Sequence, residues 1–578
     1  ALAVFSSDAL SSVAYATEEI LLVLTLAGTA MVGYSIPLSL SIIGLLVILT
    51  MSYRQIIFEY PEGGGAYIVG KSNLGEWPGL VAAAALMIDY VLTVAVSVAA
   101  GIAALTSAFP DLLAHREALC IAAILLVTVV NLRGVRESGQ FFAVPTYIFI
   151  GTLAAMLGVG AVQILLGHAT RIEPLPSLTP TEPLTLFLLL RAFSSGCTAL
   201  TGVEVISNGV SAFKKPEPKN AAFTMIGMAV ILGALFIGIS AMAYYFGIVP
   251  KSDETVVSQI ARATFGTGLL YFLVQASTMT ILILAANSSF NGFPRLASIL
   301  ARASYMPHQM SMMGDRLVFS NGVIILGVFS CLLIILFNGD THALIPLYAV
   351  GVFLSFTISQ AGMVKRWLVK KGPHWEKKLL VNGIGAVTTA IATVIIASTK
   401  FAHGAWIVIV LIPMLIMFFR AIRSHYKAVS EQVALSRGHR PPMPRRNIVV
   451  LPIGGVNRAV IRAVDYARSR SGDIRAVLVD VDPEETARVE IQWAQWGCGV
   501  PLTVLPSPYR SVLSSLLDYL EQVLQKDQEC WVTVVIPEIL PARWWQNILH
   551  NQRAFMLKGA LLFKDRVILT DVPYHLTR

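Results

Sequence analysis

The sequence has few charged side chains and few cysteines. Charged residues make up 13% of its 578 residues, whereas hydrophobic residues make up 55%. A soluble protein carries about 25% charged residues, so the composition excludes a soluble globular protein and indicates an integral membrane protein. The five cysteines are scattered, with neither metal-ligand spacing nor a disulfide framework. Because no HExxH, paired-cysteine or Ser-His-Asp pattern appears, we expect no enzyme.

Long apolar runs fill the first three quarters of the chain. At roughly 20 residues for each membrane helix, they predict twelve transmembrane helices in a domain of residues 1–425. The spans are expected at residues 1–28, 35–57, 75–107, 117–132, 141–167, 184–210, 221–247, 266–291, 319–337, 341–363, 380–398 and 403–422.

Basic residues are distributed unevenly among the predicted loops. With a cytoplasmic N-terminus, the inner loops carry most of them, including a dense run between residues 365 and 378. Cytoplasmic loops of membrane proteins are enriched in lysine and arginine, so both termini are expected in the cytoplasm. The net charge of +9 therefore requires no nucleic acid partner. The outer loops are expected to carry only Arg116, Arg171, Lys251, Arg262 and Lys400.

The composition changes after the last span. A segment rich in proline and arginine predicts a linker over residues 426–447, followed by a domain of residues 448–578. The alternation of strands and helices in that domain predicts a doubly wound parallel sheet on the cytoplasmic side. Strands are expected at 448–451, 476–481, 502–505, 531–536 and 566–569, and helices at 457–471, 484–496, 509–525 and 541–552.

Span 1 contains a carboxyl group, Asp8, within a run of serines. An ionisable side chain at bilayer depth is costly and is functional by default. No glycine precedes Gly28, although carriers that bind a carboxylate often need one to open the backbone, and this favours a small cation as substrate. Farther out, Glu18 or Glu19 could line the access path, or could pair with a polar group of span 6 or span 10.

Span 3 presents oxygen atoms along one helix face. Asp89, Thr93 and Ser97 are spaced at i, i+4 and i+8, so all three lie on the same side. Several such oxygens can replace the hydration shell of a hard cation. For the two hydroxyl groups, packing between helices is an equally plain interpretation.

Span 6 is expected to be interrupted. Gly202 separates Thr201 from Glu204 and weakens the helix, and an unwound segment would expose carbonyl groups to a cation. Glu204 is either a proton-exchanging acid or a structural acid bonded to a neighbouring helix. The Phe-Ser-Ser sequence at residues 5–7 returns at 193–195, which favours two inverted five-helix repeats.

Two glycine-rich segments do not match a phosphate loop. The segment Pro61–Tyr67 follows no strand and lacks Gly-Lys-Ser/Thr, so a re-entrant or gating turn is expected. Gly454 and Gly455 follow the first predicted strand and could approach a phosphate, although a single glycine pair is weak support.

At these residues the chain resembles the KimA-type potassium–proton symporters of the amino acid–polyamine–cation (APC) superfamily. The resemblance covers nearly the whole chain, and the residues that carry it are the run from Phe5 to Tyr15, the Pro61–Tyr67 loop, Asp89 and Tyr90 with Thr93 and Ser97, and Thr201–Glu204. It implies a LeuT-like core of ten helices plus two, high-affinity potassium import coupled to protons, a homodimer and a bacterial plasma membrane. It also implies a universal-stress-protein-like domain linked to inhibition by cyclic di-AMP.

The resemblance also implies roles for individual residues. The potassium ligands would be Tyr15, Thr93, Ser97 and Thr201, with backbone carbonyls of spans 1 and 6. The ion path or gate would comprise Asp8, Asp89, Tyr90 and Tyr348, and Glu204 would be the proton-linked acid. The glycine-rich ATP loop of stress proteins is replaced by Thr570–Pro573, so no cofactor is expected.

Two other functions fit parts of the sequence. A proton-coupled amino acid permease would share the fold, but the glycine-free span 1 and the surplus of buried acids argue against it. A membrane-anchored nucleotide sensor would need the cytoplasmic domain alone, and it would have no use for Asp8, Glu204 and the hydroxyl groups of span 3. Potassium uptake in competition with amino acids distinguishes the first alternative, and nucleotide binding without ion flux would indicate the second.

Overall fold

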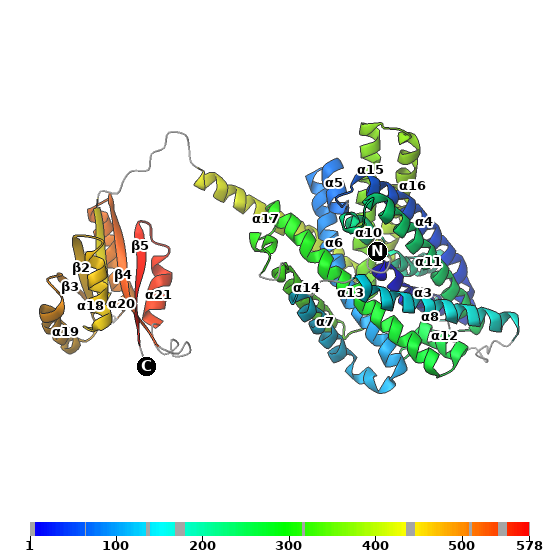
Figure 1. Cartoon of the computed structure of the whole chain (residues 1–578), viewed down its shortest axis with the longest axis horizontal. Coiled ribbons are helices and arrows are strands. Elements are labelled where there is room, and N and C mark those ends of the chain that lie inside the picture. Colours follow the sequence, from blue (N-terminus) through cyan, green and yellow to red (C-terminus); the bar gives the residue numbers. More distant parts are fainter. Residues whose placement is uncertain are drawn as a thin grey trace. The chain divides into compact units, whose positions relative to one another are not determined.

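A computed structural model describes residues 6–63, 65–134, 139–167, 180–314, 318–434, 446–507, 511–541 and 552–576. The chain divides into two compact units, Ala1–Ala434 and Leu435–Arg578 (Figure 1). The predicted linker, residues 426–447, overlaps this boundary. Residues 426–433 belong to the last helix of the first unit, and residues 435–445 lie outside the described residues.

The first unit is helical and built for a membrane. Within the described residues, eleven helices are long and apolar enough to cross a bilayer. Helix α14, at the ninth predicted span, is apolar but has 17 residues, or about 26 Å of helix, so the total of twelve spans remains a prediction. The long helices and their parts are α2 (Ser7–Ser11) with α3 (Val13–Leu24), α4 (Ser35–Glu59), α6 (Glu76–Ala108), α7 (Arg116–Leu132), α8 (Gly139–Leu165), α9 (Leu186–Gly196) with α10 (Val205–Asn208), α11 (Glu217–Phe246), α13 (Leu269–Arg302), α14 (Ser320–Leu336), α15 (Thr341–Lys370), α16 (Trp375–Lys400) and α17 (Ala405–Val433).

Shorter helices connect or extend these spans. Helix α5 (Ala66–Asn73) follows the glycine-rich segment, and α12 (Val256–Phe265) precedes α13. The 3₁₀ turns are η1 (Thr25–Ala27), η2 (Thr29–Tyr34), η3 (Pro110–His115), η4 (Cys197–Leu200), η5 (Val210–Ala212), η6 (His308–Ser311) and η7 (Phe401–His403).

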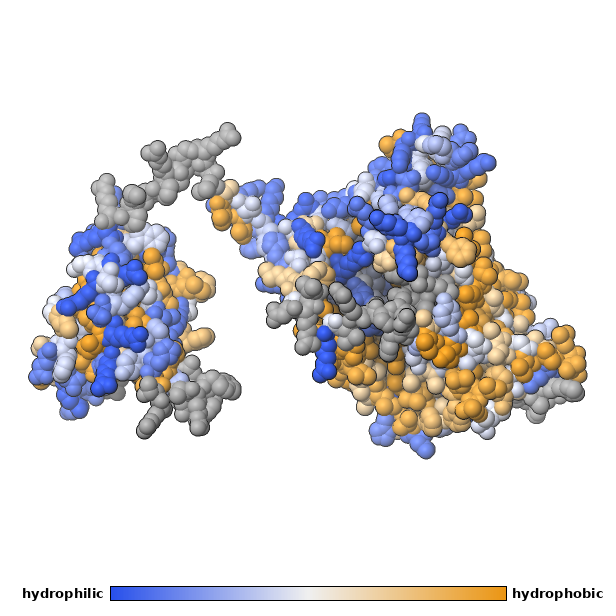
Figure 2. Space-filling model, in the orientation of Figure 1, coloured by the Kyte–Doolittle hydropathy of each residue, from blue (hydrophilic) through white to orange (hydrophobic). Residues whose placement is uncertain are grey.

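The spans differ in how deeply they are buried. The most apolar window of the first span, Ser7–Ala27, is 83% buried, as is that of α6, whereas the windows of α7 and α8 are 22% buried. Large apolar side chains such as Leu126, Val394 and Met417 are exposed on peripheral helices, and hydrophobic residues cover much of the visible surface (Figure 2). Lipid therefore faces the peripheral helices, and polar groups of spans 1 and 3 face protein.

The second unit is a five-stranded parallel sheet with the order β3-β2-β1-β4-β5. Apolar side chains alternate along the strands. Those of Val449 and Leu451 pack with α18 and α19, whereas those of Ile448 and Val450 pack with α20 and α21. Helices therefore cover both faces, which confirms the predicted parallel α/β domain. The elements are β1 (Arg446–Ile453), α18 (Arg458–Arg468), β2 (Asp473–Asp480), α19 (Pro483–Trp496), β3 (Leu502–Pro506), α20 (Val512–Lys526), β4 (Cys530–Leu540), α21 (Gln552–Leu561) and β5 (Val567–His575).

Two sequence interpretations need correction or completion. The last helix of the domain is α21 at Gln552–Leu561, whereas most of the predicted helix at 541–552 lies outside the described residues. Lys400 was assigned to an outer loop, but it is the last residue of α16 and is buried. Its long apolar stem and its hydrogen bond to Ser195 (2.6 Å) allow this burial.

Candidate functional site

The first span is interrupted beside its buried carboxyl group. Helix α2 ends at Ser11 and α3 begins at Val13. The Ser12 hydroxyl donates to the carbonyl of Ala9 (2.6 Å) and lies 3.0 Å from the carbonyl of Ala199 in η4. Serine side chains that bond to nearby carbonyls compete with the helical pattern. The interruption of span 1 is thereby joined to the interruption of span 6.

The sixth span opens between η4 and α10, at Thr201–Glu204. Gly202 has a φ of +79°, a conformation that glycine adopts without steric cost. A Cβ atom on Gly202 would lie 2.8 Å from both Asp8 Cγ and the Ala9 nitrogen. The predicted break in span 6 is therefore confirmed, and it brings the backbone of span 6 against Asp8.

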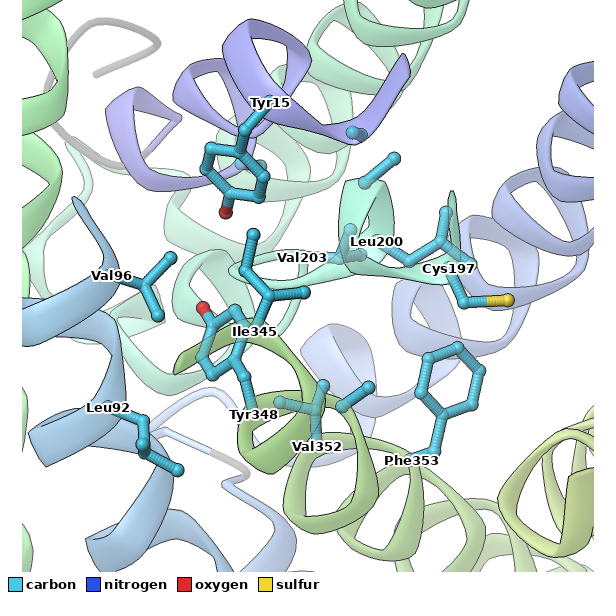
Figure 3. Packing of buried hydrophobic residues seen from close by; sticks show 14 of the residues in the cluster. Tyr15, Leu92, Val96, Cys197, Leu200, Val203, Ile345, Tyr348, Val352 and Phe353 are labelled. Carbon is cyan, nitrogen blue, oxygen red and sulfur yellow. The ribbon is translucent and has the colours of Figure 1, made fainter. Parts of the chain in front are cut away.

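Four hydroxyl-bearing residues predicted as ligands or gate meet between spans 1, 3, 6 and 10. Thr93 Oγ1 donates to the Tyr348 hydroxyl at 3.0 Å. The Thr201 side chain lies next to the hydroxyls of both Tyr15 and Tyr348. Figure 3 shows these two tyrosines, from α3 and α15, pointing their hydroxyl groups toward one another. Such a cluster offers neutral oxygen atoms to a cation.

The remaining predicted ligand, Ser97, lies one turn from Thr93 on α6. Its side chain is 2% exposed, as is that of Thr93. This burial agrees with the expected common face of Thr93 and Ser97, and it leaves the role of Ser97 as a prediction.

Three carboxyl groups surround the hydroxyl cluster. Asp8, Asp89 and Glu204 are each at most 7% exposed, and they lie close enough to influence one another electrostatically. Asp8 Oδ2 accepts from Ser288 of α13 at 3.3 Å. In the part of the chain that the structure describes, Asp89 Oδ1 and Glu204 Oε2 have no hydrogen-bond partner, and none of the three acids forms an ion pair.

Buried carboxylates without a positive partner are strongly unfavourable. Two agents relieve that cost: a proton on the carboxyl group or a cation beside it. The three carboxyl groups can therefore bind and release a proton or a cation at this site.

A cavity of about 230 Å³ adjoins the site on the predicted cytoplasmic side. It is lined by Tyr90, Ser288 and Asn208 together with Gly63 and Gly65 of the glycine-rich segment. A Cβ atom on either glycine would come within 3 Å of an oxygen of Asn208, 2.8 Å for Gly63 and 2.9 Å for Gly65. The predicted gating turn thus packs against the end of span 6, while Gly64 lies outside the described residues.

Ser288 and Asn208 were not expected as site residues. Ser288 belongs to a polar run, Asn287-Ser288-Ser289, in the middle of the otherwise apolar α13. Asn208 ends the short helix α10 and faces Tyr90. Polar residues clustered in an apolar span were a usable signal for Ser288, whereas Asn208 had no comparable signal.

Comparisons with known proteins identify the family of both units. A family model described as the KimA potassium transporter C-terminal domain matches residues 445–574, and one described as amino acid permease matches residues 1–419. The potassium transporter KimA of Bacillus subtilis is 46% identical over 578 residues, which cover 100% of this chain and 95% of that protein.

More distant similarities cover only part of the chain. The human Asc-type amino acid transporter 1 is 23% identical over 346 residues, covering 58% of this chain and 64% of that protein. A solved manganese transporter of Eremococcus coleocola has a TM-score of 0.38 and 12% identity, covering 75% of this chain and 96% of that chain.

Proposed function

The chain belongs to the KimA potassium transporter family, a transporter family and not one of enzymes, with an amino acid permease-type membrane unit, and on this premise we propose that it imports potassium together with protons. The membrane unit works by alternating access. The full-length similarity to a relative named as a potassium transporter supports potassium as the substrate.

One observation carries the proposal: unpartnered acids lie beside a cluster of buried hydroxyl groups. Potassium, a large and weakly hydrated cation, binds neutral oxygens when several replace its water shell together. Tyr15, Thr93, Ser97 and Thr201 provide these oxygens, with carbonyls of spans 1 and 6. Tyr348 closes the cluster through its contact with Thr93.

The three acids have different roles in the proposed mechanism. Asp8 and Asp89 compensate the charge of the ion along its path, and Tyr90 lines the cavity that leads from it. Glu204 carries the proton, because Glu204 Oε2 is buried without a hydrogen-bond partner among the described residues. Its position in the interrupted span 6 makes its surroundings change when the half-helices move.

The proposed architecture is that of a LeuT-like transporter. Spans 1–5 and 6–10 form two inverted repeats of a LeuT-like fold, and spans 1 and 6 are both interrupted at Ser12 and Thr201–Glu204. With α14 counted as a span, twelve helices place both termini in the bacterial cytoplasm. The protein acts as a homodimer.

The cytoplasmic domain is proposed to regulate transport. Its parallel sheet has a switch in strand order between β1 and β4, the kind of position where α/β sheets bind ligands. Cyclic di-AMP is the proposed inhibitor. Thr570–Pro573, which replaces the glycine-rich ATP loop of stress proteins, lies within β5.

An amino acid is a less suitable substrate. Its carboxylate would enter a site that already contains Asp8, Asp89 and Glu204, and the like charges would repel one another. A nucleotide sensor without transport activity would not require these acids. Both alternatives are outcomes of the test below.

The test is uptake of rubidium or potassium by purified protein in liposomes, with and without an inward proton gradient. We expect gradient-stimulated uptake that is abolished in Asp8→Asn. Competition by amino acids, or flux of amino acids in place of rubidium, would show that the substrate is an amino acid and not potassium. Nucleotide binding with no flux of either would indicate the sensor.

A further inference from the structure

A second charged cluster lies outside the ion site, on the predicted outer side. His342 Nδ1 is 2.6 Å from Glu19 Oε1, and His342 Nε2 is 3.4 Å from Glu18 Oε1. Both glutamates are buried, whereas the histidine side chain is 38% exposed. This confirms one of the two sequence interpretations, a pair between Glu19 and span 10. We propose that these three residues form a proton-operated outer gate, an inference that rests on the proposed alternating-access function.

The cluster is built on two helices that also supply the ion site. Glu18 and Glu19 follow Tyr15 by three and four residues on α3, so they lie about one turn farther out. His342 precedes Tyr348 by six residues on α15, or about 9 Å along the helix. Contact between His342 and the glutamates therefore brings the helices of Tyr15 and Tyr348 together above the ion.

Helix α15 contains a hinge between the gate and the site. Pro346 lies inside α15, between His342 and Tyr348. Proline has no N–H group, so the carbonyl of His342 lacks its helical partner, and such positions bend helices. The outer end of α15 can therefore tilt while Tyr348 keeps its position.

Glu18 also contacts helix α12. The backbone N–H of Val256, the first residue of α12, donates to Glu18 Oε2 at 3.1 Å. The preceding Thr255 donates its N–H to Ser107 Oγ on α6 at 3.0 Å. The cavity lined by this cluster measures about 50 Å³, against about 230 Å³ for the cavity beside Tyr90, so the outer cavity is the narrower of the two.

The contacts of His342 favour its charged form. Each ring nitrogen faces a carboxylate oxygen, and only the imidazolium carries hydrogens on both nitrogens. A neutral ring would turn a lone pair toward one carboxylate. Protons arriving from outside thus close the gate, and deprotonation weakens it. His342 controls access and does not replace Glu204 as the carried-proton site.

Other charged groups lie close enough to influence the protonation of His342. Asp340 caps α15 by accepting from the N–H of His342 at 2.9 Å, and the buried Lys400 is within electrostatic range of Glu19. The charged or titratable groups around the cluster are Glu18, Glu19, Asp340, Lys400, Arg116, Lys251, Asp253 and Glu254.

The gate is tested by the accessibility of a reporter cysteine, which does not depend on transport. Ala103 on α6 lines the outer cavity, and Ala103→Cys is introduced after the five native cysteines are changed to alanine. A membrane-impermeant thiol reagent is applied to right-side-out vesicles at about pH 6 and about pH 10. The higher value lies well above the titration of a free histidine, because the two carboxylate contacts keep the proton on the ring. The cysteine-free chain gives the background.

We expect His342→Gln to increase the labelling rate about tenfold at the lower pH, which corresponds to about 1.4 kcal/mol. His342→Lys keeps the positive charge and should label slowly at both pH values. The labelling rate of the parent, divided by that of His342→Lys, should rise with pH, because deprotonation of His342 weakens the gate. Dividing the two rates removes the pH dependence of thiol reactivity, which is common to both chains.

Two further variants complete the test. Glu19→Gln removes the same contact from α3 and should also label faster, which protects the test against misfolding of a His342 variant. Glu182→Gln is the matched control, since it disrupts an outer ion pair with Arg191 away from the cavity and should behave as the parent. Equal labelling of the parent, His342→Gln and Glu19→Gln would overturn the gate. Gated labelling without rubidium uptake would instead overturn the proposed function.

Discussion

Gly202→Ala should impair the ion site without perturbing the rest of the membrane unit. The new methyl group would lie 2.8 Å from Asp8 Cγ, 2.8 Å from the Ala9 nitrogen and 3.0 Å from Asp8 Oδ2. The Ala9 backbone belongs to α2, so it cannot rotate away as a flexible side chain would. Accommodation requires spans 1 and 6 to separate at the point where Asp8 meets the opened helix.

The magnitude follows from two contributions. A residue other than glycine with a φ of +79° costs about 1–2 kcal/mol. Forcing a methyl group into a packed space costs about 1–3 kcal/mol, which gives roughly 2–5 kcal/mol in total. If only the lower value, about 2 kcal/mol, is lost from the free energy of rubidium binding, the affinity for rubidium decreases roughly 30-fold. This follows because about 1.4 kcal/mol corresponds to a factor of ten in affinity.

The assay compares the rubidium KM and the thermal unfolding of Gly202→Ala with two control glycines. Gly266 also has a positive φ (+66°), but a Cβ there would meet nothing within 4 Å, so Gly266→Ala measures the backbone cost alone. Gly44 lies in α4 with open space around it, and Gly44→Ala should leave KM unchanged. A wild-type KM for Gly202→Ala, or an equal increase for Gly266→Ala, would refute the close approach to Asp8.

Three further predictions concern single side chains. Glu204→Gln keeps the shape of the buried acid, so the protein should fold, but uptake should lose its dependence on the proton gradient; uptake at the wild-type rate with unchanged pH dependence would exclude the proton role. Thr93→Val should raise the rubidium KM about tenfold through loss of one hydroxyl ligand and its bond to Tyr348, whereas Thr93→Ser should not; equal KM values would exclude a ligand role. In the cytoplasmic domain, the hydrogen bond from Arg475 holds the pKa of Asp473 below its usual range. Asp473→Asn should therefore lower stability by up to about 1 kcal/mol at neutral pH, and pulse proteolysis of the whole chain should show this difference vanish as the pH falls through the depressed pKa.

Much of the architecture could be predicted because it depends on local pattern. Apolar runs of membrane length identify most spans, since a helix must satisfy its backbone hydrogen bonds within the bilayer. The break at Gly202 followed from the residue itself, because glycine weakens a helix wherever it is placed. The parallel sheet followed from the alternation of strands and helices. Most of the helix predicted at 541–552 lies outside the described residues and stays a prediction, whereas helix α21 at Gln552–Leu561 was not predicted.

The site was predicted residue by residue, but its connections were not. Asp8 and Glu204 stood out because carboxyl groups are rare in apolar spans. Nothing in the local sequence indicated that Asp8 contacts Ser288, 280 residues away. A partner for Glu18 or Glu19 in span 6 or span 10 was one of the expectations, but the sequence did not identify it as His342, 323 residues from Glu19. The burial of Lys400 was likewise missed, since a lysine at the end of a span is ordinarily expected at the interface.

By itself, the sequence determined that this is a multi-pass membrane protein with a parallel α/β domain and with carboxyl groups inside its spans. Hydropathy and residue periodicity are properties of neighbouring residues, so they can be read along the chain. The tertiary structure decided which oxygens meet, which acids lack partners and which histidine joins span 10 to span 1. Those contacts depend on how helices pack and rotate against one another, and side chains far apart in sequence become neighbours only through that packing.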